Sequence, residues 1–345
     1  MSDASPKTTK PLTMHDIAAA AGVSPMTVSN CFRYPDRVRE KTRINVMKVA
    51  AELGYVPNIS AGLLAAGNSR VIGAVLPSMR NSSFYMYTTG LKRAAREKGH
   101  DLITMIAETP QEELSAVQTL LGLRVAGIAL VANPHASELR QLLALSNTPV
   151  VESWGSDDAI GTPVSYDVGA ASRALTRHLI KQGRRRIGFV QVSGGGGLRY
   201  AMRLPAFQQE MFNAGLPETL VLSIRAADGF GSGARILDEF LALEPRLDAI
   251  LCPTDIVAAG AVFECQRRGL SIPDDIAVAG WGDYDIGRQI SPQLTTIAPF
   301  SDEIGRHAIQ VILGGNRSAQ NTPHRLEIRQ STAFSRRNDK KAKQP

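Results

Sequence analysis

Apolar residues near the start of the chain recur at helical spacing in three short segments, residues 13–22, 24–32 and 40–54. Thr13 can cap the first segment together with Asp16, three residues on. Ser24 and Pro25 are typical of the cap and first residue of the second. The pattern predicts three helices with these apolar positions in the first and third: Ile17, Ala20, Ala21, Ile44, Met47, Val49, Ala50 and Leu53.

After Ser69 the pattern changes to short, unbroken apolar runs that alternate with amphipathic helical segments. Such runs are typical of parallel strands covered by helices on both faces. There are too many of them for one small sheet, so we expect an α/β core of two parallel-sheet subdomains. The predicted strands are residues 71–77, 102–107, 127–132, 149–153, 187–192, 249–254 and 276–281.

These patterns divide the 345 residues into consecutive parts. We expect a disordered arm (1–11), an all-α helix-turn-helix domain (12–57), a hinge helix (58–69), the core (70–335) and a disordered tail (336–345). Within the core, subdomain one should hold residues of about 70–167 and 298–329, and subdomain two about 168–297 and 330–335.

Composition narrows the class of protein. The net charge of +7 and the pI of about 9.4 fit a nucleic-acid partner without requiring one. Three cysteines without a C-x-x-C pair predict neither a disulfide framework nor a zinc site. No signal peptide and no run of about eighteen apolar residues is visible, so we expect a cytoplasmic protein that does not interact with a membrane.

The first two helices have helix-turn-helix spacing, with Gly22 in the turn. Val28 with Cys31 or Phe32 would pack on the first helix. The opposite side would then enter a major groove, where small, polar or flexible residues can contact bases and phosphates: Pro25, Met26, Thr27, Ser29 and Asn30. Basic residues would flank the groove: Arg33, Arg37, Arg39 and Lys41. The alternative is an ordinary three-helix packing module with a solvated basic face.

The stretches "TMHDIAAAAGVSPMTVSNCF", "VREKTRINVMKVAAELGYVPN" and "AGLLAAGNSRVIGAVLP" closely resemble the lactose/galactose repressor (LacI/GalR) family of bacterial transcription regulators. "VAAGAVFECQRRGLSIPDDIAVAGW" with the later "DIG" looks most like gluconate-operon repressors within it. The resemblance implies a repressor that binds double-stranded operator DNA. It extends the DNA contacts to Thr13, Met14, His15, Ser24, Thr42, Tyr55, Asn58, Ala61 and Leu64.

Four residues bear on operator choice, and one of them departs from the family. The family usually has Arg where this chain has Asn30, and Asn pairs with adenine whereas Arg pairs with guanine. Pro25 and Met26 occupy the positions that set operator choice in the family, although Pro25 alone is equally explained by its capping geometry. Leu64 matches the residue that wedges into the minor groove, and the alternative is a plain interdomain helix.

The core resembles the periplasmic sugar-binding fold, in which a ligand lies in a cleft at the carboxyl ends of strands. The effector candidates follow such strands: Ser83, Phe84, Tyr85, Trp154, Arg199, Arg203, Thr254, Asp255, Trp281, Gly282 and Asp283. Each has a structural alternative. Trp281 can belong to the core, Arg199 can be a solvated loop residue, and Asp255 can cap the following helix.

The resemblance also points to the chemistry of the effector. Gly282 stands where sugar-binding members place an Asp, and Arg203 matches the family's effector-binding Arg. Arg199 lies four residues before Arg203, one turn away if the segment is helical. A site that lacks the acid and offers this guanidinium pair suits a carboxylate, so we expect a sugar acid such as gluconate or a keto-gluconate. Asp283 could instead replace the missing acid, and a neutral sugar or a corepressor is the alternative effector.

Other classes of protein fit less well. The glycines at 194–197 do not give the dinucleotide-binding spacing, because Arg199 falls where the last glycine should be. No nucleophile elbow or set of metal ligands is visible, so we expect no enzyme, no cofactor and no metal. A periplasmic binding protein would need a signal peptide and no DNA-binding domain. The tail has no Leu or Ile for a tetramerising coiled coil, so we expect a homodimer.

Overall fold

The computed structural model describes residues 12–56, 69–79, 82–155, 158–193, 198–225, 229–315 and 318–333. The chain divides into two compact units, Met1–Asn68 and Ser69–Pro345. The predicted arm and tail, and the hinge helix with its contacts Asn58, Ala61 and Leu64, lie outside the described residues.

The first unit contains the three predicted helices and a short 3-10 turn. They are α1 (Met14–Ala21), α2 (Pro25–Arg33), η1 (Pro35–Arg37) and α3 (Glu40–Glu52). Thr13 and Asp16 form the predicted capping box of α1, and Gly22 ends this helix in the left-handed region at φ 65°. Ser24 caps α2 by accepting a hydrogen bond from the Thr27 amide. The helix boundaries thus follow from local sequence signals.

The buried face of the first unit differs in part from the prediction. Ala18 is buried in place of Ala20 on α1, and Val46 joins Ala50 on α3. Ile44 and Met47 are 58% and 45% exposed, and Leu53 is also exposed. Val46 and Ala50 are four residues apart and share one face. Val49 is half-buried and packs beside them, whereas Met47 points away from this face. The complete buried cluster is Ile17, Ala18, Ala21, Val28, Cys31, Val46 and Ala50.

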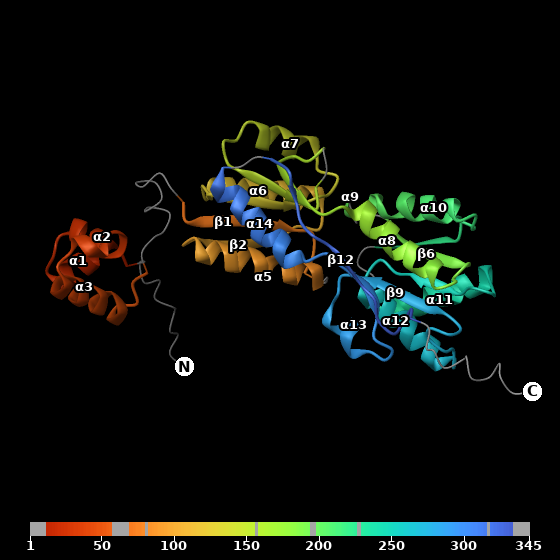
Figure 1. Cartoon of the computed structure of the whole chain (residues 1–345). Coiled ribbons are helices and arrows are strands. Elements are labelled where there is room, and N and C mark those ends of the chain that lie inside the picture. Colours follow the sequence, from red (N-terminus) through yellow and green to blue (C-terminus); the bar gives the residue numbers. More distant parts are fainter. Residues whose placement is uncertain are drawn as a thin grey trace, which may run out of the picture. The chain divides into compact units, whose positions relative to one another are not determined.

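The second unit contains two six-stranded sheets, as predicted for the core (Figure 1). The first sheet is entirely parallel, in the order β11-β5-β4-β3-β1-β2. Its strands are β1 (Val71–Leu76), β2 (Asp101–Ile106), β3 (Gly127–Val131), β4 (Val150–Ser153), β5 (Thr162–Ser165) and β11 (Gln320–Asn321). Helices α6 (Pro110–Gly122) and α7 (Ser137–Ala144) cover one face, and α5 (Ser82–Glu97) and α14 (Ser301–Gly314) cover the other.

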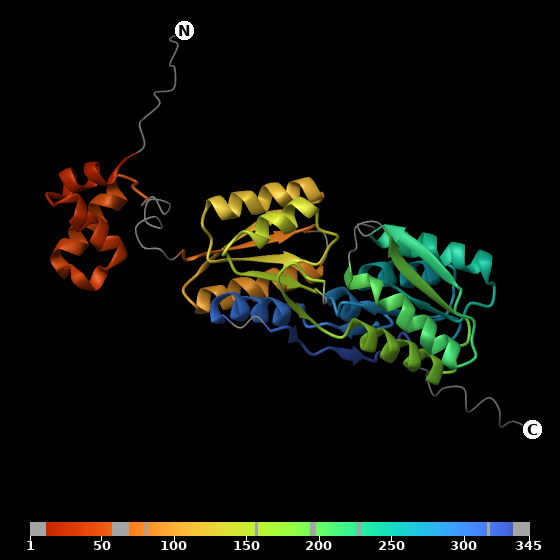
Figure 2. The same cartoon turned by 90° about the horizontal axis from the view of Figure 1, so that it is seen from above.

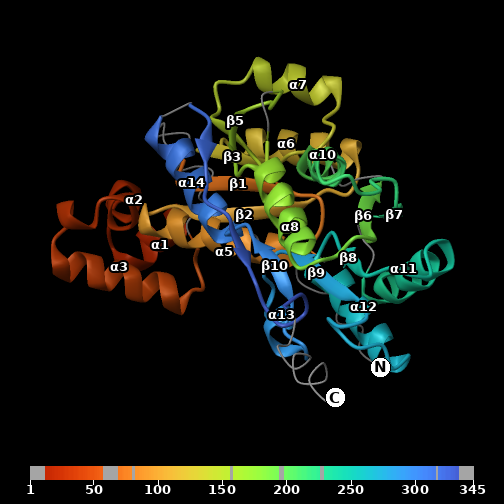
Figure 3. The same cartoon turned by 45° about the vertical axis from the view of Figure 1, so that its right-hand side comes forward.

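The second sheet has the order β12-β10-β9-β8-β6-β7, and only β12 runs antiparallel to its neighbour. Its strands are β6 (Ile187–Ser193), β7 (Val221–Arg225), β8 (Ala249–Leu251), β9 (Ala277–Trp281), β10 (Thr295–Ala298) and β12 (Arg325–Glu327). Helices α8 (Val168–Lys181) and α10 (Arg203–Asn213) cover one face, and α11 (Phe230–Leu243) and α12 (Asp255–Arg267) cover the other (Figure 3). The short helices α9 (Leu198–Ala201) and α13 (Asp285–Gln289) complete this subdomain.

The chain passes between the two subdomains three times. It leaves sheet one after β5, returns after β10 as α14, and crosses again between β11 and β12. Figure 2 shows α14, in blue, lying along α5, in orange. The sequence assigned residues up to 329 to subdomain one, but β12 already pairs with β10 in the second sheet. The last crossing therefore occurs earlier than expected.

Every strand predicted from an apolar run is present, which confirms the α/β class of the core. The strands that the pattern missed are short or carry polar residues: β5, β7, β10, β11 and β12. Among the residues that the structure describes, none of the helices combines the length and apolar character needed to cross a bilayer.

Candidate effector pocket and DNA-reading helix

Helix α2 presents the side chains that the sequence assigned to base reading. Val28 and Cys31 are buried against the other helices, whereas Met26 is 70% exposed. Ser29 and Asn30 are half-buried beside this surface. A helix with its apolar face packed and a short polar face accessible can enter a major groove.

Some of the predicted DNA contacts also have structural roles. The Thr27 hydroxyl lies 2.9 Å from the Ser24 hydroxyl at the start of α2. The guanidinium of Arg37 stacks on Tyr34, 4.7 Å from the ring centre, and Tyr55 packs against Phe32. Pro25, Arg33 and Thr42 are half-buried, as is Met14 beside the apolar cluster, whereas His15 and Arg39 are exposed.

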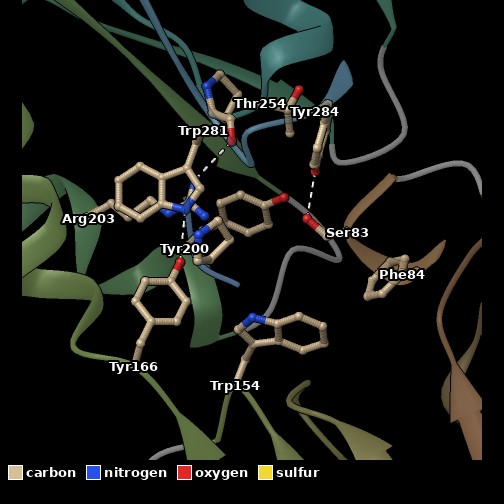
Figure 4. Close-up of a pocket in the computed structure, with 11 residues that line it drawn as sticks. Ser83, Phe84, Trp154, Tyr166, Tyr200, Arg203, Thr254, Trp281 and Tyr284 are labelled. Carbon is tan, nitrogen blue, oxygen red and sulfur yellow. Dashed lines mark hydrogen bonds between the residues drawn. The ribbon is translucent and has the colours of Figure 1, made fainter. Parts of the chain in front are cut away.

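A pocket lies between the two subdomains of the core, at the carboxyl ends of several strands (Figure 4). Trp154 follows β4, Trp281 ends β9, and Thr254 follows β8. This is where ligands bind in parallel α/β sheets. The described residues that line it are Ser83, Phe84, Trp154, Tyr166, Tyr200, Arg203, Pro253, Thr254, Trp281, Tyr284 and Pro299.

Arg203 is the charged residue of this lining and is only 7% exposed. Its guanidinium lies over the Trp281 ring at 3.7 Å from the ring centre and over the Tyr200 ring at 4.4 Å. Its Nη1 donates to the Pro253 carbonyl at 2.9 Å. The indole of Trp281 in turn donates to the Tyr166 hydroxyl at 2.8 Å. A buried guanidinium held by aromatic faces is positioned to pair with a carboxylate.

Six of the residues predicted to bind an effector come together in this pocket: Ser83, Phe84, Trp154, Arg203, Thr254 and Trp281. Tyr85 does not, because it is 67% exposed on α5. The Arg199 side chain lies outside the described residues.

Asp255, Gly282 and Asp283 were also expected to contact the ligand, and none of them belongs to the lining. Asp255 is fully buried and accepts hydrogen bonds from the Tyr284 amide and the Thr296 hydroxyl. Burial raises its pKa to about 7, although these two bonds lower it. Asp255 thus supports the turn that carries Tyr284.

Asp283 forms ion pairs with Arg288 and Arg329. Burial alone would raise the pKa of Asp283, but hydrogen bonds from these two arginines outweigh it and keep the pKa below its usual value. The possibility that Asp283 replaces the missing pocket acid is therefore not supported, since its carboxylate is already paired.

The aromatic residues that sequence analysis missed are Tyr166, Tyr200 and Tyr284. Tyr166 follows β5, a strand too short and too polar to predict. Tyr284 lies only two residues after Gly282, in a turn where both Gly282 and Asp283 have positive φ. The two consecutive positive φ values could not be deduced from the pattern.

A buried ionic cluster in subdomain one joins His135 to Glu113 of α6 and Glu152 of β4. His135 Nδ1 is 2.9 Å from Glu113, and its Nε2 is 3.4 Å from Glu152. Burial alone would lower the pKa of His135, but the two carboxylates raise it from 6.5 to about 9. Glu152 also accepts the Ile160 amide at 2.7 Å. Glu152 thus ties the end of β4 to Ile160, two residues before β5.

Within the described part of the chain, no group of three or more His, Cys, Asp or Glu side chains is arranged to hold a metal ion.

Comparison with known proteins covers both units. Residues 13–58 match the bacterial regulatory proteins of the lacI family, and residues 176–333 match the periplasmic binding protein-like domain. The chain is 30% identical over 321 residues to the HTH-type transcriptional regulator GntR of Escherichia coli strain K12, a match that covers 91% of this chain and 95% of that protein.

Solved structures agree with these matches. A LacI-family transcriptional regulator from Silicibacter pomeroyi aligns with a TM-score of 0.85 at 26% identity, covering 94% of this chain and 100% of that chain. The lac repressor dimer bound to operator and an anti-inducer aligns with a TM-score of 0.80 at 24% identity over the same shares, which shows a common fold. The chain therefore belongs to the LacI family of bacterial regulatory proteins, which are DNA-binding transcription regulators and not enzymes.

Proposed function

We propose that this regulator represses genes for the uptake or breakdown of a sugar acid of the gluconate type, and that the acid releases it from its operator. The observation that carries the proposal is the charge of the pocket. Arg203 is the single charged side chain among the described lining residues, and no carboxylate accompanies it there. A ligand carboxylate can pair with this guanidinium without facing a negative charge in the lining.

Two further observations support an acid. Gly282 leaves the family's usual acidic position without a side chain. The chain is also similar over most of its length to a regulator named GntR. Both favour the gluconate-type effector over a neutral one.

Calorimetry with gluconate and glucose tests the effector. We expect gluconate to bind and glucose not to bind, because only gluconate carries the carboxylate that Arg203 would hold. Arg203→Ala should abolish the effect of gluconate on operator binding while leaving operator affinity unchanged. Arg246→Ala, which removes an exposed arginine of the same subdomain, is the matched control. Binding of glucose with gluconate inert would refute the acid.

A neutral sugar is the second candidate, favoured by the aromatic rings of the lining, since such rings stack on the apolar face of a pyranose. The direction of regulation is tested by the same titration. Gluconate should weaken operator binding, and a ligand that strengthens operator binding would indicate a corepressor instead.

We further propose a cytoplasmic homodimer that places one α2 helix in each half of a near-palindromic operator. Strand β2 supports a dimer, because it is the edge of sheet one and exposes Ile103 and Ile106. Light scattering should give a dimer at micromolar concentration, and a stable tetramer would contradict it.

Selection from random DNA should enrich palindromes. Leu64→Ala should reduce operator affinity more than non-specific affinity if Leu64 is the minor-groove wedge.

A further inference from the structure

Tyr284 occupies the space that the family's pocket acid would need. A Cβ atom added to Gly282 would lie 2.2 Å from Cε1 of the Tyr284 ring. Gly282 also has φ 133°, a conformation that L side chains rarely adopt. The ring and the backbone together therefore exclude any carboxylate at position 282.

The backbone of Tyr284 is held in place by Asp255. Its amide donates to Asp255 Oδ2 at 2.7 Å, and the Thr296 hydroxyl donates to Asp255 Oδ1 at 2.6 Å. The residue is buried, and burial raises the pKa of its phenol, which stays protonated and able to donate. Tyr284 thus presents a fixed hydroxyl group from subdomain two.

This hydroxyl reaches across the pocket to the other subdomain. The Tyr284 hydroxyl lies 2.6 Å from Ser83 Oγ, in the first turn of α5 (Figure 4). The space that remains between the lining residues is about 20 Å³, enough for about one water molecule. Sites for small-molecule ligands enclose roughly 300–1,000 Å³. A ligand of that size needs more room than this, and a separation of the two subdomains here would break the Ser83–Tyr284 bond.

We propose that Tyr284, with Ser83, determines the specificity of the pocket for hydroxylated ligands. When the pocket opens, the Ser83 and Tyr284 hydroxyl groups lose the hydrogen bond between them. The lining around them is largely aromatic. A ligand hydroxyl can replace this hydrogen bond, whereas an alkyl chain cannot. A buried polar group that has lost its hydrogen bond destabilises the complex. Arg203 then selects the carboxylate, and the Ser83–Tyr284 pair selects a polyhydroxy acid over a plain carboxylic acid. The inference rests on the proposed sugar-acid effector.

The test compares gluconate with hexanoate, which has the same number of carbons and the same carboxylate but no hydroxyl groups. Calorimetry on the full-length protein should show a strong preference for gluconate. In Tyr284→Phe we expect the ratio of gluconate to hexanoate affinity to fall about tenfold, because opening the pocket no longer breaks a bond that only gluconate can replace. Ser83→Ala should act in the same direction from the other side of the pocket.

Tyr87→Phe is the matched control. It removes a buried tyrosine hydroxyl that lies 2.7 Å from a serine, Ser153, but neither residue lines the pocket. Its ratio of gluconate to hexanoate affinity should equal that of the wild type, and thermal unfolding checks that every variant folds.

The possible failures differ from one another. If Tyr284→Phe weakens both ligands equally or leaves the ratio unchanged, the role of Tyr284 is refuted while the sugar-acid effector stands. If Tyr284→Phe does not fold, Ser83→Ala decides by the same ratio. If the wild-type protein binds neither acid, the proposed function fails and this inference fails with it.

Discussion

Replacing Asp255 with asparagine should change how the stability of the core depends on pH. Burial raises the pKa of Asp255 from 3.8 to about 7. Between these values the folded chain keeps a proton that the unfolded chain has released, so the free energy of unfolding falls as the pH rises. The stabilisation that the folded chain gains from the proton on Asp255 is complete below pH 3.8 and is lost as the pH rises through about 7. Above that pH, Asp255 is ionised in both the folded and the unfolded chain.

The expected size follows from the width of this window. From pH 5 to pH 7 the wild type should lose about 2 kcal/mol relative to Asp255→Asn. The slope is about 1.4 kcal/mol per pH unit and becomes smaller near pH 7, where the folded chain is half ionised. Asparagine keeps an oxygen that can accept the Thr296 hydroxyl, so the variant should fold.

Urea unfolding at pH 5, 6, 7 and 8 and constant protein concentration measures the effect. The difference between variant and wild type should move in favour of Asp255→Asn up to pH 7 and then level off. Asp158→Asn, at an exposed carboxylate, controls for the change in net charge. A difference that stays constant from pH 5 to pH 8 would refute the raised pKa.

Three further changes test other parts of the molecule. Gly90→Ala should destabilise the core by about 2–4 kcal/mol in thermal unfolding, because the added Cβ would lie 2.0 Å from the Asp302 carbonyl oxygen. A Cβ added at Gly122 meets nothing within 4 Å, so the control Gly122→Ala should be nearly neutral. His135→Gln should lower the free energy of unfolding by about 2–3 kcal/mol at pH 7 and by clearly less at pH 10. The pKa of His135 is raised from 6.5 to about 9, so its stabilising contribution is lost as the pH rises through that value. Urea unfolding that gives the same loss at both pH values would contradict this. Asn30→Ala should cost about 1–3 kcal/mol at one base-pair position in operator-binding assays and relax specificity there; an even loss on all sequences contradicts base reading.

Local signals predicted the helices of the first unit well. The capping pair of Thr13 and Asp16 acts within one helical turn, so the sequence alone fixes where α1 begins. The buried face of α3 depends on how three helices pack, and apolar spacing did not separate Val46 from its exposed neighbours Ile44 and Met47.

The lining of the pocket was also predicted only in part from the sequence. The rule that ligands bind at the carboxyl ends of strands was enough to select Trp154, Arg203 and Trp281. It could not find Tyr284, because that ring enters the pocket through the unusual backbone of the turn at Gly282. The absence of an acid at Gly282 was visible in the sequence, but the side chain that fills its place required the structure.

The path of the chain has a consequence for synthesis on the ribosome. Sheet one receives five strands from residues 71–165, yet α14 and β11 arrive only with residues 301–321. At about 5–20 residues per second, roughly 8–30 s separate the two. During that interval the face of α5 that later packs against α14 is uncovered in the nascent chain. A chaperone, or α5 of a neighbouring nascent chain, can occupy this apolar face before α14 emerges.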